Sequence, residues 1–368
     1  MKRTLIVVII AFSSVTYLSA QDIDSIVDSL VARRSITEKV TLKLSTYNSS
    51  EWFEVAGSNG QPGFDIRPND AIMNKVGFNY RFLSFSYKFL ISALPPNADD
   101  EEKGETTANG FNFALSPGQW ATDFSWDKTK GYYLRNTDDF DNTWMDGDPY
   151  FQFPNLESQI FRARIGRVLN PEYSINAVTT QTEEQLASQG TFLPSLRLTY
   201  YTVNDKEPFG PNVTTTQRAR QFEAIFSVGY LYTLVLGKGF YTSVDLRPGL
   251  GYLNTGLLTR FANANDIEAN TDHFVTGFDT DLQLGYNSSK FFTGIRGSYD
   301  HYEHDQYETS AARITNERLR VEFFFGIRLK APEQMKANLD KAEANMLKYM
   351  VKRKLRREER KKQKLNQN

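Results

Sequence analysis

The 368-residue sequence contains no cysteine, which excludes disulfide bonds, thiolate metal sites, cysteine nucleophiles and a cysteine-linked lipid anchor. Its three histidines, His273, His301 and His304, are too few for an imidazole-rich metal site. No apolar run reaches the roughly 18–20 residues that a transmembrane helix needs, so a polytopic helical membrane protein is excluded. We therefore expect no metal and no cofactor.

The first twenty residues have the order of a secretory signal peptide. Lys2 and Arg3 precede the apolar run at 5–12 (LIVVIIAF), and Leu18-Ser19-Ala20 resembles a cleavage site. We expect cleavage after Ala20, because eight apolar residues are too few to span a bilayer. Export of a chain without cysteine is typical of the bacterial envelope rather than of eukaryotic secreted domains.

Charge is unevenly distributed along the chain. Residues 331–368 hold 12 Lys/Arg and 5 Asp/Glu, a net charge of +7, whereas the whole chain has a net charge of −1. Residues 1–330 therefore carry −8, and removal of Lys2 and Arg3 with the signal peptide leaves −10 on residues 21–330. The sequence thus predicts an acidic body and a basic tail.

From about residue 39 to 330 the hydrophobic period is two, which is typical of β-strands. Phe222, Phe226 and Val228, for example, alternate with Glu223 and Ser227. Such runs reach ten to eighteen residues, longer than the roughly 5–6 of globular sheets and long enough for the ~9–11 of a membrane strand.

The connections between these runs are of two kinds. Tight turns are expected at 82–83, 116–118, 170–171, 236–239 and 287–290. Long polar segments lie at 92–107, 134–156, 257–270 and 303–312. Short turns at one end and long loops at the other predict an all-β fold, a transmembrane antiparallel β-barrel in the outer membrane. The alternative is a soluble secreted β-sandwich.

The number of strands follows from parity. Thirteen alternating runs are present, but a barrel with both ends on one side of the membrane needs an even number. Three runs, 172–182, 191–203 and 218–235, lie between two turns that belong on the same side, and the adjacent segment 183–190 is polar. One strand assignment near this segment must therefore be wrong, and we expect about twelve strands.

Outside the barrel at 39–330, the sequence predicts helices. In the periplasmic segment 21–38, apolar residues from Ile23 to Val31 recur at helical spacing. In the tail at 331–368, Pro332 is followed by Met335, Leu339 and Ala342 at a spacing of four and three. Residues 352–364 are nearly all charged, which in an exported protein favours peptidoglycan or an acidic periplasmic partner over nucleic acid. A solvated tail in the periplasm is the alternative.

Residues 168–200 resemble a recurrent stretch of an uncharacterised, Bacteroidetes-type family of outer-membrane β-barrels, a domain of unknown function. The matching positions are Leu169-Asn170, Tyr173-Ser174, Gln181, Gln185, Ser188, Gly190 and Phe192. Residues 130–134 and the double-strand element at 76–89 are also similar. The resemblance covers about 40–330 and implies a barrel fold without implying an activity.

In a barrel, the alternation directs a set of charged side chains into the lumen. These are Arg162, Arg164, Arg197, Arg247, Arg296, Arg318 and Arg320 with Asp245, Asp279, Asp281 and Glu322. Mutual neutralisation in a narrow lumen is one interpretation, because isolated buried charges are costly. The other is a narrow channel for small solutes, since rings of charge set pore selectivity. A structural or partner-binding barrel in contact with outer-membrane lipid is compatible with either.

A second candidate site is the cluster Asp300, His301 and His304 at the expected outer rim. Neutral imidazole can accept a proton near pH 7, so this cluster suggests an outer-membrane hydrolase as an alternative function. No Gly-x-Ser-x-Gly elbow accompanies it, and a third histidine for a metal is missing. A solvated acidic loop explains the same residues.

Overall fold

The computed structural model describes residues 32–48, 53–55, 62–211, 213–304, 318–345 and 348. The chain divides into two compact units, Val31–Leu329 and a second made of Met1–Leu30 with Lys330–Asn368. The expected signal peptide with its cleavage after Ala20, the expected helix before residue 32 and the charged segment 352–364 lie outside the described residues.

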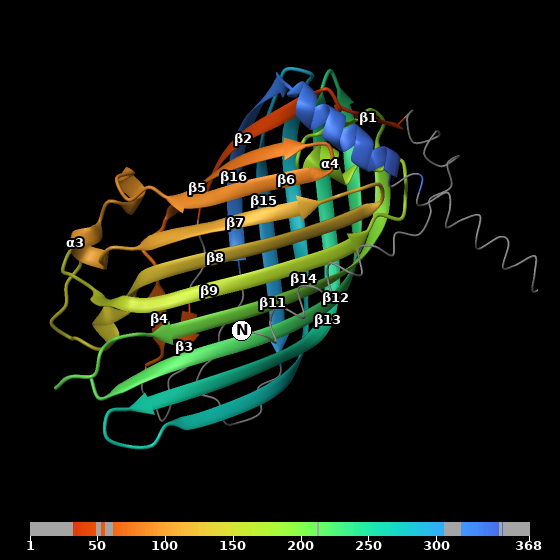
Figure 1. Ribbon diagram of the computed structural model, residues 1–368. Helices are drawn as coiled ribbons and strands as arrows, with labels where there is room; N and C mark the ends of the chain where they lie inside the picture. The colour runs from red at the N-terminus through yellow and green to blue at the C-terminus, as the bar shows by residue number, and fades with distance from the viewer. Residues whose placement is uncertain are drawn as a thin grey trace, which may run out of the picture. The chain divides into compact units, whose positions relative to one another are not determined.

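Twelve antiparallel strands close into a barrel in the first unit (Figure 1). Each strand pairs with the next one along the chain, and the ring closes because β16 pairs with β2. The ring comprises β2 (Lys39–Asn48), β5 (Ile72–Tyr80), β6 (Leu83–Leu90), β7 (Thr107–Leu115), β8 (Trp120–Leu134), β9 (Phe151–Arg167), β11 (Gln189–Asp205), β12 (Thr215–Gly237), β13 (Phe240–Phe261), β14 (Ile267–Asn287), β15 (Phe291–His304) and β16 (Arg318–Lys330). The predicted antiparallel barrel of about twelve strands is confirmed.

Smaller elements lie at the two ends of the ring. Strands β3 (Phe53–Val55) and β4 (Phe64–Arg67) form a hairpin that pairs with the end of β8, where Ile66 lies opposite Leu134. Two short helices, η1 (Pro95–Asn97) and α3 (Asp100–Lys103), follow β6, and η2 (Thr137–Asp139) follows β8. The remaining elements are β1 (Arg33–Ser35), α4 (Ile175–Val178) and β10 (Glu183–Gln185). In the second unit, residues 333–345 form a helix, as predicted for the start of the tail.

The connections are short at one end of the barrel and longer at the other. Residues 81–82, 116–119, 238–239 and 288–290 make the short turns, and Gly237 and Gly239 have φ of 91° and 88°, which a side chain would strain. The expected long loop at 257–270 is mostly strand instead, since β13 ends at Phe261 and β14 begins at Ile267. These two strands stay paired out to Thr259 and Ile267, and β12 pairs with β13 as far as Thr215 and Phe261.

The two faces of the wall differ in chemistry, as the period of two requires. On the outer face, Val228, Leu282 and Phe323 are 43%, 58% and 57% exposed, whereas their inward neighbours Ser227 and Gln283 are buried. An apolar exterior around a polar interior is the pattern of a transmembrane barrel. No helix within the described residues is long and apolar enough to cross a membrane.

Residues 172–182, expected to form a strand, do not. Pro171 cannot donate a ladder hydrogen bond, and the Ser174 hydroxyl accepts one from the Ala177 amide at 3.0 Å, which starts α4 instead. Removing this run from the thirteen leaves the even number that parity requires. In Figure 1, α4 lies at the end of the barrel that carries the short turns.

Candidate functional site in the barrel lumen

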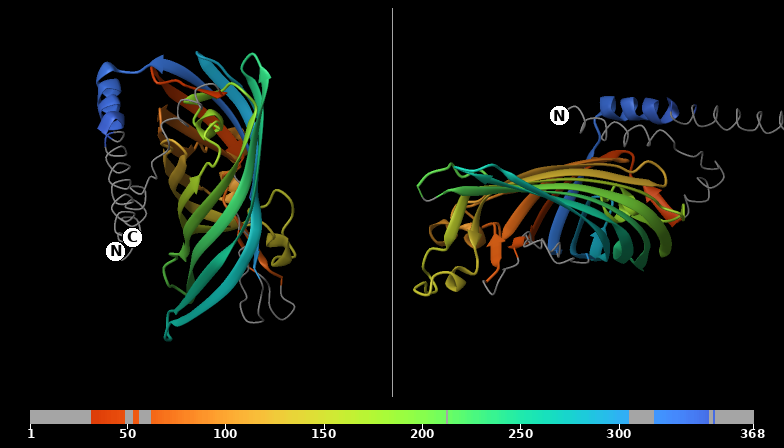
Figure 2. Two further views of the ribbon diagram at one scale, coloured as in Figure 1. Left: turned by 90° about the vertical axis from the view of Figure 1, so that its right-hand side faces the viewer. Right: turned by 90° about the horizontal axis from the view of Figure 1, so that it is seen from below.

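Residues 168–188, called the plug from here on, leave the wall between β9 and β11 and fold into the barrel. Both ends of the plug lie close together: the Leu169 amide donates to the Phe192 carbonyl at 3.0 Å, and Asn170 Nδ2 donates to the Gly190 carbonyl at 2.9 Å. The wall strands therefore continue past the plug without a gap, as the pairing of β9 with β11 at Gly166 and Ser195 shows. Figure 2 (left) shows α4 inside the ring of strands.

The plug has a packed core of its own. Tyr173 is 2% exposed and packs with Val168 of the plug and with Leu193 and Leu231 of the wall. Its hydroxyl accepts a hydrogen bond from Thr233 Oγ1 at 3.4 Å, and burial raises the pKa of Tyr173. Ser174, Gln181 and Thr182 are fully buried. The plug is thus an ordered element and not a loop that lies in the lumen by chance.

Wall side chains satisfy the carbonyl groups of the plug. Lys43 Nζ donates to Thr179 O at 3.2 Å, Asn79 Nδ2 to Thr180 O at 3.3 Å, Asn287 Nδ2 to Glu183 O at 3.0 Å and Arg328 to Gln181 O. In the opposite direction, the Thr182 hydroxyl donates to Arg81 O at 2.7 Å. These partners come from β2, β5, β14 and β16 and from the turn after β5. The plug is therefore bonded to strands around much of the ring at the short-turn end.

The plug also pairs with the residues that precede β2. Strands β1 and β10 form a two-stranded antiparallel sheet, reinforced by ion pairs of Arg33 with Glu183 and of Arg34 with Glu184. The Ile36 amide donates to Thr182 O at 2.9 Å. The chain entering the barrel and the plug therefore form one bonded structure.

Two cavities lie against the plug. A cavity of about 280 Å³, called the chamber, is lined by Tyr173, Val178 and Thr180 of the plug and by inward residues of the wall. A second cavity of about 360 Å³, called the crevice, lies between Val178 and the β12–β14 side of the wall near the short turns. Leu231 lines the chamber and Thr233, the next inward residue of β12, lines the crevice. The two spaces are therefore neighbours along β12, divided where the plug packs.

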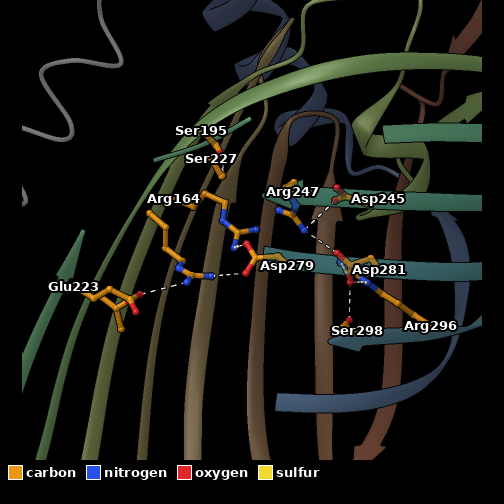
Figure 3. A network of polar contacts seen from close by, with 12 residues as sticks. Arg164, Ser195, Glu223, Ser227, Asp245, Arg247, Asp279, Asp281, Arg296 and Ser298 are labelled. Atoms are coloured by element: carbon orange, nitrogen blue, oxygen red, sulfur yellow. Dashed lines mark hydrogen bonds and ion pairs between the residues drawn. The ribbon is translucent and has the colours of Figure 1, made fainter. Parts of the chain in front are cut away.

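Four of the predicted arginines and four acidic residues form two neighbouring groups of ion pairs, together called the charge ladder, on one side of the lumen (Figure 3). Asp279 pairs with Arg164 at 3.1 Å and with Arg197 at 2.7 Å, and Arg197 also pairs with Glu223 at 3.3 Å. Asp281 pairs with Arg247 at 2.7 Å and with Arg296 at 2.8 Å, and Asp245 pairs with Arg247 at 2.9 Å. Each of these charges thus has an opposite charge in contact, which offsets the cost of its burial.

The remaining predicted lumen residues lie outside the charge ladder. Glu322 pairs with Lys75 at 2.8 Å and lines the chamber, and the Arg320 guanidinium lies 4.8 Å from the centre of the Tyr47 ring. Arg162 and Asp300 line a cavity of about 30 Å³ beside Arg197. The side chain of Arg318 is outside the described residues.

Of the predicted rim cluster, Asp300 and His301 lie on opposite faces of β15. The His301 ring stacks at 12° on the Tyr299 ring, 6.1 Å between centroids, and lies 5.9 Å from the Phe278 ring. Asp300 faces the opposite side of β15, because successive residues of a strand point to opposite faces. The His304 side chain is outside the described residues. Among the residues that are described, no group of His, Asp and Glu is arranged to hold a metal ion.

Sequence reasoning missed Lys43 and Lys75 of the chamber and the whole plug. The two lysines follow the same alternation as the predicted set, so strand parity alone could have placed them. For the plug, Pro171 followed by the capping serine Ser174 was the available signal of a helix start.

Comparison with known proteins follows from this architecture. Similar solved structures include the outer membrane protease OmpT from Escherichia coli (8% identity, TM-score 0.33, covering 80% of this chain and 96% of OmpT). The β-domain of the Bordetella autotransporter BrkA (9%, 0.34, 80% and 99%) and the monoaromatic hydrocarbon channel CymD (7%, 0.26, 84% and 92%) are also similar. These likenesses are too weak to indicate a shared function. No curated protein sequence matches the chain.

A family model described as a domain of unknown function, DUF4421, matches residues 33–328, most of the chain and the whole described barrel apart from its last strand residues. The predicted membership of an uncharacterised family is confirmed. The chain belongs to the DUF4421 family.

Proposed function

We propose that this protein is an outer-membrane barrel enclosing a narrow polar passage for small solutes, which the plug holds closed in the state described. The apolar exterior supports residence in a bilayer, and the expected signal peptide supports export to the outer membrane. In this arrangement the short-turn end faces the periplasm. The first strand of the barrel begins at this end and the last strand finishes there. The basic tail at 331–368 would then reach peptidoglycan or an acidic periplasmic partner.

One observation carries the proposal: polar cavities lie on both sides of a single packed barrier. The chamber and the crevice share Val178, and Tyr173 packs against Leu231 at the boundary between them. The diameter of a barrel grows with its strand number, so twelve strands enclose more space than wall side chains alone fill, and the plug divides that space. Moving Tyr173 and Val178 would join the two spaces into a continuous passage along β12.

The test is conductance of the full chain in planar bilayers. We expect the intact protein to remain closed for most of the recording. The variant Tyr173→Ala/Val178→Ala removes the side chains at the barrier and should raise the open fraction and the conductance several-fold. Leu169→Ala is the matched control, because Leu169 belongs to the plug but is 52% exposed.

A second variant makes the test independent of the two barrier residues. Replacing residues 171–188 by two glycines should leave the barrel intact, because Asn170 already contacts Gly190. This excision should give a permanently conducting barrel. If it folds, judged by heat-modifiable migration in gels, and conducts no more than the intact chain, the passage does not exist and a structural or partner-binding barrel is the better assignment.

A further inference from the structure

We propose that the chamber contains a binding site for a small cation, centred on Asp123. This inference rests on the proposed function, because it concerns the solute that the passage would admit. It concerns the wall of the chamber formed by β6, β7 and β8, which adjoins the charge ladder at Arg164 of β9.

Asp123 differs from the other charged residues that line the chamber. Arg164, Arg247 and Arg296 are paired with acids of the charge ladder, Lys75 with Glu322, and Lys43 with carbonyl and amide oxygens of the plug. Within the described part of the chain, Asp123 has no ion pair and no side-chain hydrogen bond. Its carboxylate faces the chamber, and its oxygen atoms are available to accept hydrogen bonds or to bind a cation.

The strand register explains why Asp123 is left unpaired. Arg164 lies directly across from it in the pairing of β8 with β9, close enough for an ion pair. The Arg164 guanidinium instead donates to Asp279 of β14 at 3.1 Å. The neighbour on the other side, Ala114 of β7, carries no charge. The cation across the strand from Asp123 is thus paired with the charge ladder, which leaves the Asp123 carboxylate without an ion pair at the chamber wall.

Neighbouring side chains add neutral oxygen atoms. Asn112 precedes Ala114 by two residues on β7 and lines the chamber; its Nδ2 donates to Phe124 O at 3.2 Å, which leaves Oδ1 as an acceptor. Ser84 and Ser86 of β6 line the same wall. One carboxylate with amide and hydroxyl oxygens is the ligand type that alkali cations and ammonium groups prefer. The chamber volume of about 280 Å³ admits a small amine but no bulky one.

Three salts, tested on the intact full chain, distinguish binding of an alkali cation from binding of a small amine. The midpoint of heat-modifiable unfolding is measured in potassium chloride, methylammonium chloride and tetrabutylammonium chloride at one ionic strength. A ligand that binds only the folded state raises the midpoint. We expect a saturable increase of a few degrees with methylammonium relative to tetrabutylammonium, which is too large for the chamber. An equal increase with potassium would identify a general small-cation site.

The decisive variant is Asp123→Asn, which should abolish the increase. Its control is Asp127→Asn, four residues along β8 on the same face, where the carboxylate is already paired with Lys88 at 2.6 Å. Asp127→Asn lowers the starting midpoint but should retain the cation-dependent increase. An increase that survives Asp123→Asn, or a midpoint that is the same in all three salts including tetrabutylammonium chloride, would overturn the proposal.

A second readout separates this proposal from the passage itself. In the full-length Tyr173→Ala/Val178→Ala variant, the reversal potential in a potassium chloride gradient should be cation-selective and move toward zero when Asp123→Asn is added. If the variant fails to conduct while the Asp123-dependent stabilisation is present, the passage is wrong and the cation site stands. If it conducts with a reversal potential that Asp123→Asn leaves unchanged, the cation site is wrong and the passage stands.

Discussion

The wall and the plug differ in how their backbone groups are satisfied. In the wall, each strand pairs with two neighbouring strands, so backbone groups bond to other backbone groups. In the plug, the carbonyls of Thr179, Thr180 and Gln181 accept hydrogen bonds from side chains of Lys43, Asn79 and Arg328. The wall is therefore specified by a repeating local pattern, whereas the plug depends on particular long-range partners.

This difference has a consequence for stability. A closed ring leaves no free strand edge and unfolds as one unit, while the plug is held by a small aromatic core and a limited number of side-chain bonds. We expect local opening of the plug to cost less than unfolding of the wall.

Tyr173→Ala should have the largest effect on the plug and little effect on the wall. It removes a buried aromatic ring that packs against Val168, Leu193 and Leu231, and such substitutions typically cost about 3–5 kcal/mol. We expect limited proteolysis to cut within 171–188 in this variant but not in the intact protein. Heat-modifiable migration of the barrel should be retained. Simultaneous loss of the barrel would show that plug and wall form a single cooperative unit.

The sequence predicted the wall because membrane and lumen impose opposite chemistry on alternate residues. Val228 and Ser227 are assigned to the correct faces by parity alone. The same parity predicts that the residues of the charge ladder point into the lumen. It does not predict which acidic residue pairs with which arginine. Arg164 and Asp279 are 115 residues apart and meet only because five strands of fixed register, from β9 to β14, bring them together across the lumen.

The plug could not be predicted by the same reasoning. Tyr173, Ile175 and Ala177 alternate with Ser174 and Asn176, which imitates a strand. The contacts that decide its conformation are distant in sequence: Asn79 bonds to Thr180 across 101 residues, and Arg328 to Gln181 across 147. Only the parity of the strand count indicated that one assignment in this region was wrong.

Leu282→Arg tests the wall. Leu282 is at mid-strand on the outer face and 58% exposed, and arginine at such a position in a bilayer costs on the order of 2–4 kcal/mol. The matched variant is Ser243→Arg, which lies one residue from the register partner of Leu282, Val244, and lines the chamber. We expect urea unfolding in lipid vesicles to show a much smaller loss for Ser243→Arg. Equal losses would mean that the facing of the strands is misassigned.

Ser174→Ala tests a single cap of the plug. Its hydroxyl accepts from the Ala177 amide at 3.0 Å and donates to Glu183 at 2.6 Å, so the substitution removes a helix cap worth roughly 1 kcal/mol together with a buried hydrogen bond. We expect an intermediate increase in proteolysis at 171–188, below that of Tyr173→Ala. Ser174→Thr keeps the hydroxyl and should restore protection. Protection that is unchanged in Ser174→Ala would indicate that packing alone holds the plug.

Deleting residues 334–368 should have the smallest effect on the barrel. The last ring strand ends at Lys330, and Pro332 cannot continue a sheet ladder, so the strands of the ring are complete before the deleted segment begins. Residues 333–345 are helical, and the deleted segment holds 12 Lys/Arg and 4 Asp/Glu, a net charge of +8. We expect unchanged heat-modifiable migration and loss of co-sedimentation with isolated peptidoglycan. A control that keeps the helix but replaces the basic residues of 352–364 by glutamine should lose co-sedimentation equally. Failure of the truncated chain to form the barrel would show that the tail takes part in assembly, and retained co-sedimentation would show that the barrel itself makes the contact.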